Sequence, residues 1–308
     1  MSDRLPLGRV AIVGLGLIGG SLAAALKAGS LAADVVAWGR RESTLQEGLR
    51  LGVIDRYSLS LADAVRGADL VVIATPTLVV ETVIEQLAAV LDAHTVVSDA
   101  ASVKANVVAA ARRAFNPAQL ARFVPGHPIA GSERSGVGAA DAALYRDHRV
   151  ILTPLPESDA GAVALVDAVW QAVGAEVVTM SVAEHDRILA ATSHLPHMLA
   201  FTLVDALAAQ TQQRDIFRFA AGGFRDFTRI ASSDPQMWHD IALANRAAIL
   251  TAIDDFSQHL ARLRGAIDDG DGAGIMATFQ QAKAARDRFA AMFSGAAAGA
   301  AKNAYHQE

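Results

Sequence analysis

The sequence predicts an α/β domain built on a parallel sheet, followed by an all-α domain. Two observations predict this class. Through the first 180 of the 308 residues, short apolar runs alternate with segments of helical pattern, which is the order of βαβ units. After residue 180 the alternation stops and only helical patterns follow. We therefore expect one domain at 1–180, a second at 181–294 and a flexible Ala/Gly-rich tail at 295–308.

The strands are expected where short unbroken apolar runs are bounded by turn residues. Such runs are typical of strands buried on both faces of a sheet. Val10–Val13, which ends in glycines, is the first of them. The others are expected at Val35–Trp38, Asp69–Ala74, Thr95–Ser98, Phe123–Val124, Val150–Leu152 and, as an edge strand, Glu176–Val178. Helices are expected between them at Ser21–Ala28, Leu45–Leu51, Val79–Leu91, Val103–Ala114 and Ala162–Val173.

The second domain is expected to consist of helices at 183–212, 213–221, 235–262 and 271–293. Residues His185–Ala209 are apolar on nearly every side of a helix, and such a helix has to be buried all round. Burial against a second copy of the chain predicts a homodimer through the C-terminal helices. The alternative is that the other C-terminal helices cover this segment within one chain.

A glycine motif, G-x-G-x-x-G, follows the first strand and precedes the first helix. Gly14 permits the tight turn, Gly16 lets the backbone approach a pyrophosphate, and Gly19 lets the helix pack closely on the strand. The pyrophosphate would meet free N–H groups at the helix N-terminus, beside Leu17 and Ile18. The motif therefore predicts that the first domain is a Rossmann-type dinucleotide-binding domain. The alternative is a glycine-rich turn that binds no ligand.

The end of the second strand distinguishes between the two nicotinamide cofactors. A site for NAD usually has an acidic residue there, which binds the ribose 2′-hydroxyl. This chain instead has Gly39, Arg40 and Arg41, and a guanidinium suits the 2′-phosphate of NADP. NADP is therefore favoured over NAD, with use of both left open, and the alternative is that both arginines are ordinary solvated charges. Thr75 and Pro76, which close the third strand, are further expected cofactor contacts.

Three further segments combine turn residues with chemically active side chains. S-D-A-A-S-V-K follows the fourth strand, at the carboxyl edge where open α/β sheets bind ligands. P-G-H-P-I-A-G-S-E is expected to be a turn-rich loop, and F-R-D-F-T-R-I-A-S-S-D-P-Q-M-W lies in the helical domain. With S-H-L-P-H between the last two and the glycine motif before them, the chain from Val10 to about Ile241 resembles the prephenate/arogenate (cyclohexadienyl) dehydrogenase family of tyrosine biosynthesis.

The resemblance implies oxidative decarboxylation of prephenate to 4-hydroxyphenylpyruvate, of arogenate to tyrosine, or of both. In this reaction the ring C4 gives a hydride to NAD(P)+, the C1 carboxylate leaves as CO2 and the ring becomes aromatic. His127 matches the family's catalytic histidine, which accepts the C4 hydroxyl proton; alternatively it only closes a Gly-His-Pro turn. Ser102 matches a serine that hydrogen-bonds the same hydroxyl, and it is also an expected cofactor contact. Its alternative or additional role is to cap a helix that begins at Val103.

The resemblance also implies which residues bind the substrate. Arg229 matches the family's carboxylate-binding arginine, whose fork pairs bidentately with a carboxylate. The alternative for Arg229 is a structural ion pair with Asp226. His197 matches a second histidine that lines the pocket, and its alternative is a core histidine beside Pro196 that contacts no substrate.

Four further positions match the mouth or the wall of the family's pocket. They are Ser132, Glu133, Gly222 and Trp238. Glu133 is expected to be a gating or polar-contact group rather than a base. Trp238 is equally a candidate for a plain core residue.

Composition and spacing exclude several kinds of partner. The net charge is −5 and no basic stripe with interleaved aromatic residues occurs, so no nucleic acid is expected. The absence of cysteine excludes disulfides and thiolate metal sites, and it fits the reducing cytoplasm. No uninterrupted apolar stretch reaches the roughly 18 residues of a membrane span, so no membrane association is expected. No metal is expected, because the His185, Asp186, His194 and His197 group lacks the i, i+4 spacing of helical zinc ligands.

Two rival interpretations are discounted. β-Hydroxyacid and 6-phosphogluconate dehydrogenases have a similar layout but rely on a lysine early in the helical domain, and this chain has none between Val182 and Phe217. A non-catalytic NADP(H)-sensing protein would not need Ser102, His127 and Arg229 together. The sequence leaves open which of prephenate and arogenate is preferred, and whether tyrosine binds back as a product inhibitor.

Overall fold

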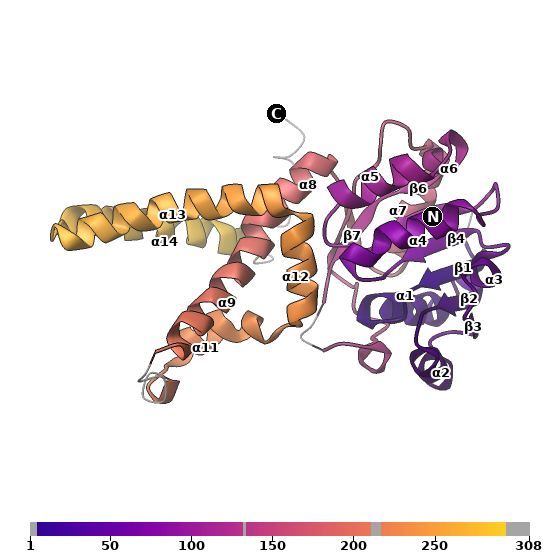
Figure 1. Cartoon of the computed structure of the whole chain (residues 1–308), viewed down its shortest axis with the longest axis horizontal. Helices are drawn as coiled ribbons and strands as arrows, with labels where there is room; N and C mark the ends of the chain where they lie inside the picture. Colours follow the sequence, from indigo (N-terminus) through magenta and orange to yellow (C-terminus); the bar gives the residue numbers. More distant parts are fainter. Residues whose placement is uncertain (1–4, 132–133, 211–216, 294–308) are drawn as a thin grey trace. The chain divides into compact units, whose positions relative to one another are not determined.

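The parallel sheet expected in the first part of the chain is confirmed by the computed structural model, which describes residues 5–131, 134–210 and 217–293 (Figure 1). Within these residues, the sheet has six strands in the order β3-β2-β1-β4-β5-β6, and every neighbouring pair is parallel. Because the order reverses between β1 and β4, the carboxyl ends of these two strands flank the crevice where such sheets bind ligands. The strands are β1 (Leu7–Val13), β2 (Ala32–Trp38), β3 (Arg56–Ser58), β4 (Leu70–Ile73), β5 (Val96–Asp99) and β6 (Phe123–Val124).

Helices cover both faces of this sheet. Val10 and Ile12 of β1 pack into one buried cluster with Leu22 of the first helix. Ala11 and Val13 pack into a second cluster with side chains of the fourth and fifth helices. Successive side chains of a strand point to opposite faces, so burial on both faces explains the unbroken apolar runs. The helices are α1 (Leu17–Ala28), α2 (Glu42–Arg50), α3 (Leu61–Val65), α4 (Val80–Ala88), α5 (Ala105–Ala114), α6 (Pro117–Ala121) and α7 (Ala160–Ala172), with 3-10 turns at Thr77–Val79 and Val137–Ala139.

A second, three-stranded sheet corrects the prediction that all strands join one parallel sheet. Its order is β7-β8-β9, and β7 runs antiparallel to β8. A turn-rich loop was expected at the position of β7. The reason is that Gly126 and Pro128 are residue types of low strand propensity. An edge strand tolerates proline, and β7 is at the edge, with Pro128 in register with Val150. The strands are β7 (Gly126–Ile129), β8 (Arg149–Leu152) and β9 (Glu176–Thr179).

The rest of the described chain is helical, as predicted. The helix expected at 235–262 is in fact two helices, because the chain breaks at Asn245. Of the helix expected at 213–221, residues 213–216 lie outside the described residues. The elements are α8 (Val182–Leu189), a π-helical turn (Ala190–His194), α9 (Leu195–Ala208), α11 (Gly222–Thr228), a 3-10 turn (Arg229–Ser232), α12 (Pro235–Ala244), α13 (Arg246–Asp268) and α14 (Gly272–Phe293).

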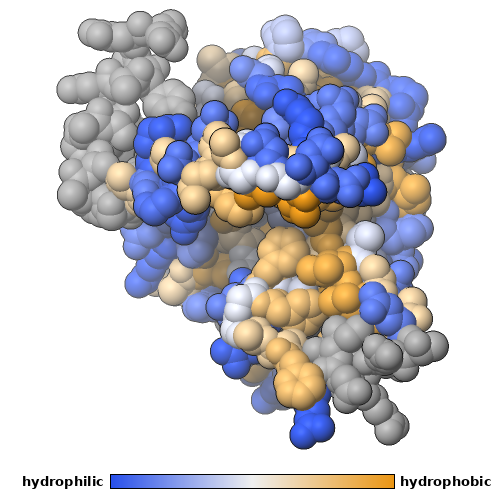
Figure 2. Space-filling view, turned by 90° about the vertical axis from the view of Figure 1, so that its left-hand side faces the viewer, coloured by the Kyte–Doolittle hydropathy of each residue, from blue (hydrophilic) through white to orange (hydrophobic). Residues whose placement is uncertain are grey.

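The chain separates by its contacts into two compact units, residues 1–249 and 250–308. The boundary expected at 180/181 therefore stays a prediction, and the tail at 295–308 lies outside the described residues. In α9, which belongs to the first unit, Ala200 is buried while Leu203 is 36% exposed. Most of this apolar helix is thus only partly covered, and Figure 2 shows apolar surface on one face of the molecule. None of the described helices combines the length and the hydropathy needed to cross a bilayer.

Candidate active site

The turn after β1 has the shape that a dinucleotide needs. Gly14 has a φ of +105°, and a Cβ there would lie 2.7 Å from the carbonyl oxygen of Ala74. A Cβ on Gly19 would lie 2.1 Å from the carbonyl oxygen of Gly14, so only glycine lets α1 pack this closely. A Cβ on Gly16 would meet nothing within 4 Å. Space therefore remains where the backbone of such a turn approaches a pyrophosphate.

The N-terminus of α1 is left free for an anion. Its cap residue, Gly16, offers no side chain to the first N–H groups, and the first turn at Leu17 and Ile18 contains no acidic residue. Thr75 and Pro76 follow β4 beside this turn. The buried Oγ1 of Thr75 has no hydrogen-bond partner within the described part of the chain. The open turn, the free N–H groups and this hydroxyl together fit the pyrophosphate of a dinucleotide.

The end of β2 carries the two arginines that are predicted to contact a 2′-phosphate. Gly39, Arg40 and Arg41 follow Trp38, and Arg41 precedes the first turn of α2. Both arginines are exposed, and neither forms an ion pair with a residue that the structure describes. Their guanidinium groups are therefore available to a phosphate.

His127 lies on β7, with 9% of its surface exposed and in register with Ile151 of β8. Its Nδ1 is 2.8 Å from Nε2 of His185. Burial lowers the pKa of His127 well below its usual value, and the charges of His185, Lys104 and His194 lower this pKa further. The imidazole is therefore neutral at physiological pH and is able to accept a proton.

Lys104 and Asp99 form an ion pair in which both side chains are fully buried. Lys104 Nζ also donates to the carbonyl oxygen of Gly126 at 2.6 Å. Asp99 accepts from the N–H of Gly126 at 3.2 Å and from that of Ala101 at 2.9 Å. Burial lowers the pKa of Lys104, and the charge of Asp99 opposes this. The pair ties the start of β7 to the end of β5 and so places His127 at the carboxyl edge of the large sheet.

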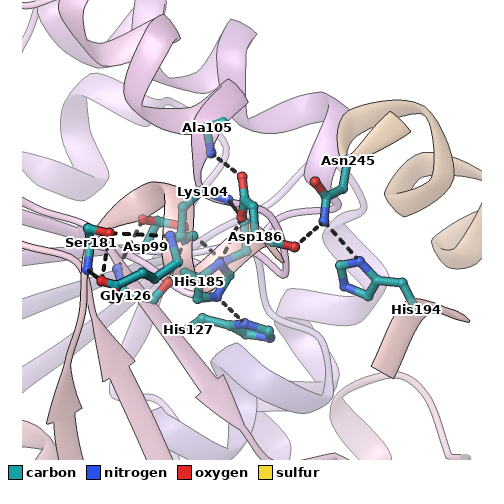
Figure 3. Close-up of polar contacts among 12 residues, drawn as sticks. Asp99, Lys104, Ala105, Gly126, His127, Ser181, His185, Asp186, His194 and Asn245 are labelled. Carbon is teal, nitrogen blue, oxygen red and sulfur yellow. Dashed lines mark hydrogen bonds and ion pairs between the residues drawn. The ribbon is translucent and has the colours of Figure 1, made fainter. Parts of the chain in front are cut away.

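Asp186 of α8 holds the N-terminus of α5. Its carboxylate accepts from the N–H groups of Lys104 at 2.8 Å and Ala105 at 2.9 Å, and lies 2.7 Å from Nδ1 of His185 (Figure 3). Burial acts to raise the pKa of Asp186, but the hydrogen bonds from His185, Lys104 and Ala105 outweigh it and leave the pKa lowered. Asp186 is therefore an ionised acceptor that joins the helical part to the sheet.

Ser102 lies half-buried between β5 and α5. The prediction that it caps a helix beginning at Val103 is wrong, because α5 begins at Ala105 and Asp186 supplies the cap from 82 positions away. The Ser102 hydroxyl forms no hydrogen bond with any residue in the described ranges. It is thus free to bond a ligand.

A second group of side chains comes from α9 and α12. The ring of His197 stacks on Trp238, with centroids 3.6 Å apart and planes at 20°. Nδ1 of His197 lies 2.9 Å from the carbonyl oxygen of Ser193, and because a carbonyl only accepts, Nδ1 carries the hydrogen. Burial lowers the pKa of His197. The hydrogen bond to Ser193 raises this pKa in part, and the positive charge of Arg229 lowers it further. His197 is therefore neutral, with a lone pair on Nε2.

Trp238 is buried, with 7% of its surface exposed. Its indole Nε1 has no hydrogen-bond partner among the described residues. Buried donors are nearly always paired, so a plain core role does not satisfy this N–H. It is a candidate donor to a ligand.

Asn245 connects the hydrogen bonds around Asp186 with the group of side chains that contains Trp238. Its Nδ2 donates to the carbonyl oxygen of Asp186 at 2.8 Å and to Nδ1 of His194 at 3.1 Å. Burial lowers the pKa of His194 to about 4, and the His194 ring lies 6.2 Å from that of Trp238. Asn245 lies at the break between α12 and α13, and its side-chain amide links Asp186 to His194.

The remaining candidates form none of the hydrogen bonds or ring contacts described above. Arg229 opens the 3-10 turn after α11, is exposed, and forms no ion pair with Asp226 in the described residues. Gly222 opens α11, and a Cβ there would meet nothing within 4 Å. Ser132 and Glu133 lie outside the described residues.

Sequence reasoning missed the contacts of four residues, which are Lys104, His185, Asp186 and Asn245. It weighed His185 and His194 only as metal ligands, and the described residues contain no group of three or more His, Asp or Glu side chains placed to hold a metal ion. No local pattern pairs His185 with His127, which lies 58 positions away. The one signal present was the S-D-A-A-S-V-K segment, which contains both members of the buried ion pair.

Comparison with known proteins gives consistent matches along the chain. The family model described as prephenate dehydrogenase, nucleotide-binding domain, matches residues 22–179. The family model described as prephenate dehydrogenase, dimerization domain, matches residues 181–281.

Individual relatives match over similar lengths. A cyclohexadienyl dehydrogenase from Zymomonas mobilis is 37% identical over 279 residues, which cover 90% of this chain and 94% of that protein. The crystal structure of prephenate dehydrogenase from A. aeolicus in complex with hydroxyphenyl propionate and NAD+ has a TM-score of 0.87 at 34% identity, covering 93% of this chain and 100% of that one. The crystal structure of Synechocystis arogenate dehydrogenase has a TM-score of 0.78 at 27% identity, covering 91% of this chain and 99% of that one.

Proposed function

Because the chain belongs to the prephenate dehydrogenase family, we propose that it catalyses the NAD(P)-dependent oxidative decarboxylation of prephenate, arogenate or both. The products are 4-hydroxyphenylpyruvate from prephenate and tyrosine from arogenate. The observation that carries the proposal is the buried neutral imidazole of His127, held at the same carboxyl edge as the open glycine turn. A base and a dinucleotide cradle at one edge are what hydride removal from an alcohol carbon requires.

The reaction needs a proton acceptor as well as a hydride acceptor. The nicotinamide, when bound, supplies the acceptor for the hydride on ring C4. The chain holds the C4 hydroxyl: His127 Nε2 accepts its proton as the C4–O bond gains carbonyl character, and Ser102 Oγ hydrogen-bonds the same oxygen. The bond from C1 to its carboxylate then breaks, CO2 leaves, and the electron pair makes the ring aromatic. His127 returns the proton to the phenolate oxygen, so protons balance over the cycle.

The second group of side chains is proposed to hold a substrate carboxylate. Arg229 can pair with it through two hydrogen bonds, and the unpartnered Nε1–H of Trp238 is a further donor. His197 is neutral and keeps the indole in place by stacking on it. The pocket mouth is proposed to include Ser132 and Glu133, and the pocket wall to include Gly222.

Replacing Arg229 by Ala is expected to act on binding. A hydrogen bond to a charged group contributes about 1.5–3 kcal/mol, so its loss should raise the KM for the substrate roughly 10–100-fold with little change in kcat. Arg225→Ala, an exposed arginine of α11, is the matched control. Steady-state kinetics check this, and a KM equal to that of the control would indicate that Arg229 binds no carboxylate.

The cofactor is proposed to be NADP in preference to NAD. Exposed, unpaired guanidiniums at Arg40 and Arg41 support a 2′-phosphate contact. The double variant R40A/R41A is expected to raise the KM for NADP+ at least tenfold and to leave that for NAD+ nearly unchanged, since one charge-assisted hydrogen bond contributes about 1.5–3 kcal/mol. Arg50→Ala, which removes an exposed guanidinium of α2 paired with Glu47, is the control. An equal increase in the KM for NADP+ and in the KM for NAD+ would rule out the phosphate contact.

The working unit is proposed to be a homodimer formed through the C-terminal helices. The partly covered apolar helix α9 and the matched dimerization domain support it. Large apolar residues are also exposed on α12, α13 and α14, namely Met237, Leu243, Leu250, Leu260, Ile267, Met276 and Phe279. Contact with a second copy would remove such surface from water. Sedimentation equilibrium of the full chain at micromolar concentration measures the mass directly.

One assay tests the proposed function as a whole. The purified chain is mixed with prephenate or arogenate and with NAD+ or NADP+, and absorbance at 340 nm is followed. Turnover in at least one combination is expected, together with release of CO2, and the ratios of kcat/KM give the substrate and cofactor preference. Tyrosine added to the active combination measures product inhibition. No reduction of either cofactor with either substrate would overturn the proposal.

A further inference from the structure

Three side chains form a line of hydrogen bonds that ends at His127. The Asp186 carboxylate is 2.7 Å from Nδ1 of His185, and Nε2 of His185 is 2.8 Å from Nδ1 of His127 (Figure 3). His185 is fully buried, Asp186 is 6% exposed and His127 is 9% exposed. At this depth the partners of Nδ1 and Nε2 of His185 and of Nδ1 of His127 are protein atoms, so the hydrogen positions along the line depend on one another.

The carboxylate sets the direction of this line. Asp186 also receives the N–H groups of Lys104 and Ala105, so it acts only as an acceptor. His185 must then carry a hydrogen on Nδ1, and in the imidazole tautomer with its single hydrogen on Nδ1 the lone pair is on Nε2. That lone pair receives the hydrogen on Nδ1 of His127. The free lone pair of His127 is therefore on Nε2.

The other charged and titratable groups around His127 form hydrogen bonds with other partners. From the segment before α5, Lys104 donates to Asp99 and to the carbonyl oxygen of Gly126. From the π-helical turn, His194 accepts from Asn245, and burial lowers the pKa of His194 to about 4. Neither Lys104 nor His194 interrupts the line from Asp186.

We propose that His185 and Asp186 are positioning residues, which hold His127 in the tautomer whose Nε2 accepts the substrate proton. The inference rests on the proposed role of His127 as the base. Which nitrogen of a histidine carries hydrogen is set by the partner of the other nitrogen, so a base at Nε2 needs an acceptor fixed at Nδ1. The carboxylate also stabilises the positive charge that His127 gains when it takes the proton.

The same carboxylate positions the segment that carries Ser102. Asp186 caps α5, and Ser102 lies two positions before Lys104, the first residue that Asp186 holds. One side chain of α8 thus fixes both groups proposed to contact the C4 hydroxyl.

The tautomers are measured directly in the unmodified protein. The full chain is labelled with 15N-histidine, and two-bond 15N–1H correlation spectra are recorded near pH 7.5, with the His127 and His185 signals assigned by substitution. Both rings are expected to carry hydrogen on Nδ1 and none on Nε2. Hydrogen on Nε2 of His127 would overturn the proposal. Because this readout needs no turnover, it stands apart from the test of the proposed function.

Kinetics of two variants test the consequence. An amide at position 186 must direct an N–H at one of the three donors that face it, and it lacks the negative charge. Asp186→Asn is expected to lower kcat on the order of 10²–10⁴-fold with KM nearly unchanged, as expected when a catalytic histidine loses its orienting carboxylate. His185→Phe should do the same, and because the line acts as a unit, the double variant should lose little more than either single one.

The pH profile separates positioning from a structural role. Loss of the carboxylate's charge disfavours the His127 imidazolium, so the acid limb of kcat/KM should move to lower pH in Asp186→Asn. Ser181→Ala is the control, because it removes the capping box of the same helix without touching the line. That control should lower Tm and keep the wild-type pH profile. Additive losses, or an Asp186→Asn profile identical to that of the control, would overturn the proposal.

Discussion

Replacing His127 by Asn is expected to lower kcat on the order of 10²–10⁴-fold, the usual contribution of one general base, with a modest change in KM. Asparagine keeps a similar volume and a polar group on β7 but has no basic nitrogen. The proposed binding of substrate by Arg229 and Trp238, and of cofactor by the glycine turn, should therefore persist. Steady-state kinetics and a separate titration with NADP+ measure the two effects.

The pH dependence gives the same prediction a second measurement. Burial, with the charges of His185, Lys104 and His194, lowers the pKa of His127 well below its usual 6.5. The active imidazole is neutral, so wild-type kcat/KM should stay high as pH falls through 6.5 and decline only at lower pH. His148→Asn, at an exposed histidine before β8, is the control and should retain the wild-type rate and profile. Near-normal turnover of His127→Asn would remove His127 from the mechanism.

The fold was predictable where the local pattern and the tertiary environment agree. β1, β2, β4 and β5 were found from apolar runs because both of their faces are buried. β7 was missed because its sequence, Gly126–Ile129, has little strand propensity, and only pairing with β8 makes it a strand. The break at Asn245 was missed for a related reason, since the amide there is held by contacts with Asp186 and His194.

The candidate site was predictable only as far as its motifs extend. The glycine turn was found from spacing, and its open position at Gly16 follows from the same pattern. His127 and Ser102 were found through resemblance. The partner of His127 and the cap of α5 both come from α8, more than 50 positions away, and sequence spacing does not encode such contacts. This is why the Ser102 cap was wrong and why Asp186 was considered only as a metal ligand.

Replacing Lys104 by Met is expected to destabilise the protein by about 3–5 kcal/mol, because it leaves the carboxylate of Asp99 buried without its counter-charge. Both side chains of this pair are fully buried, and Lys104 also holds the start of β7 through the carbonyl oxygen of Gly126. Methionine fills a similar volume, so the cost is chiefly electrostatic. Urea denaturation followed by far-UV circular dichroism measures the free energy of unfolding.

Two further variants distinguish the buried charge from a general loss of packing. Lys27→Met removes one member of a pair with Asp55 whose side chains are 29% and 37% exposed, so it should cost less than about 1 kcal/mol. The double variant K104M/D99N removes the charge left behind and should recover a large part of the lost stability, since the penalty belongs to the unpaired carboxylate. A loss in Lys104→Met no larger than in Lys27→Met, or no recovery in the double variant, would show that the ion pair does not hold β7 against the large sheet.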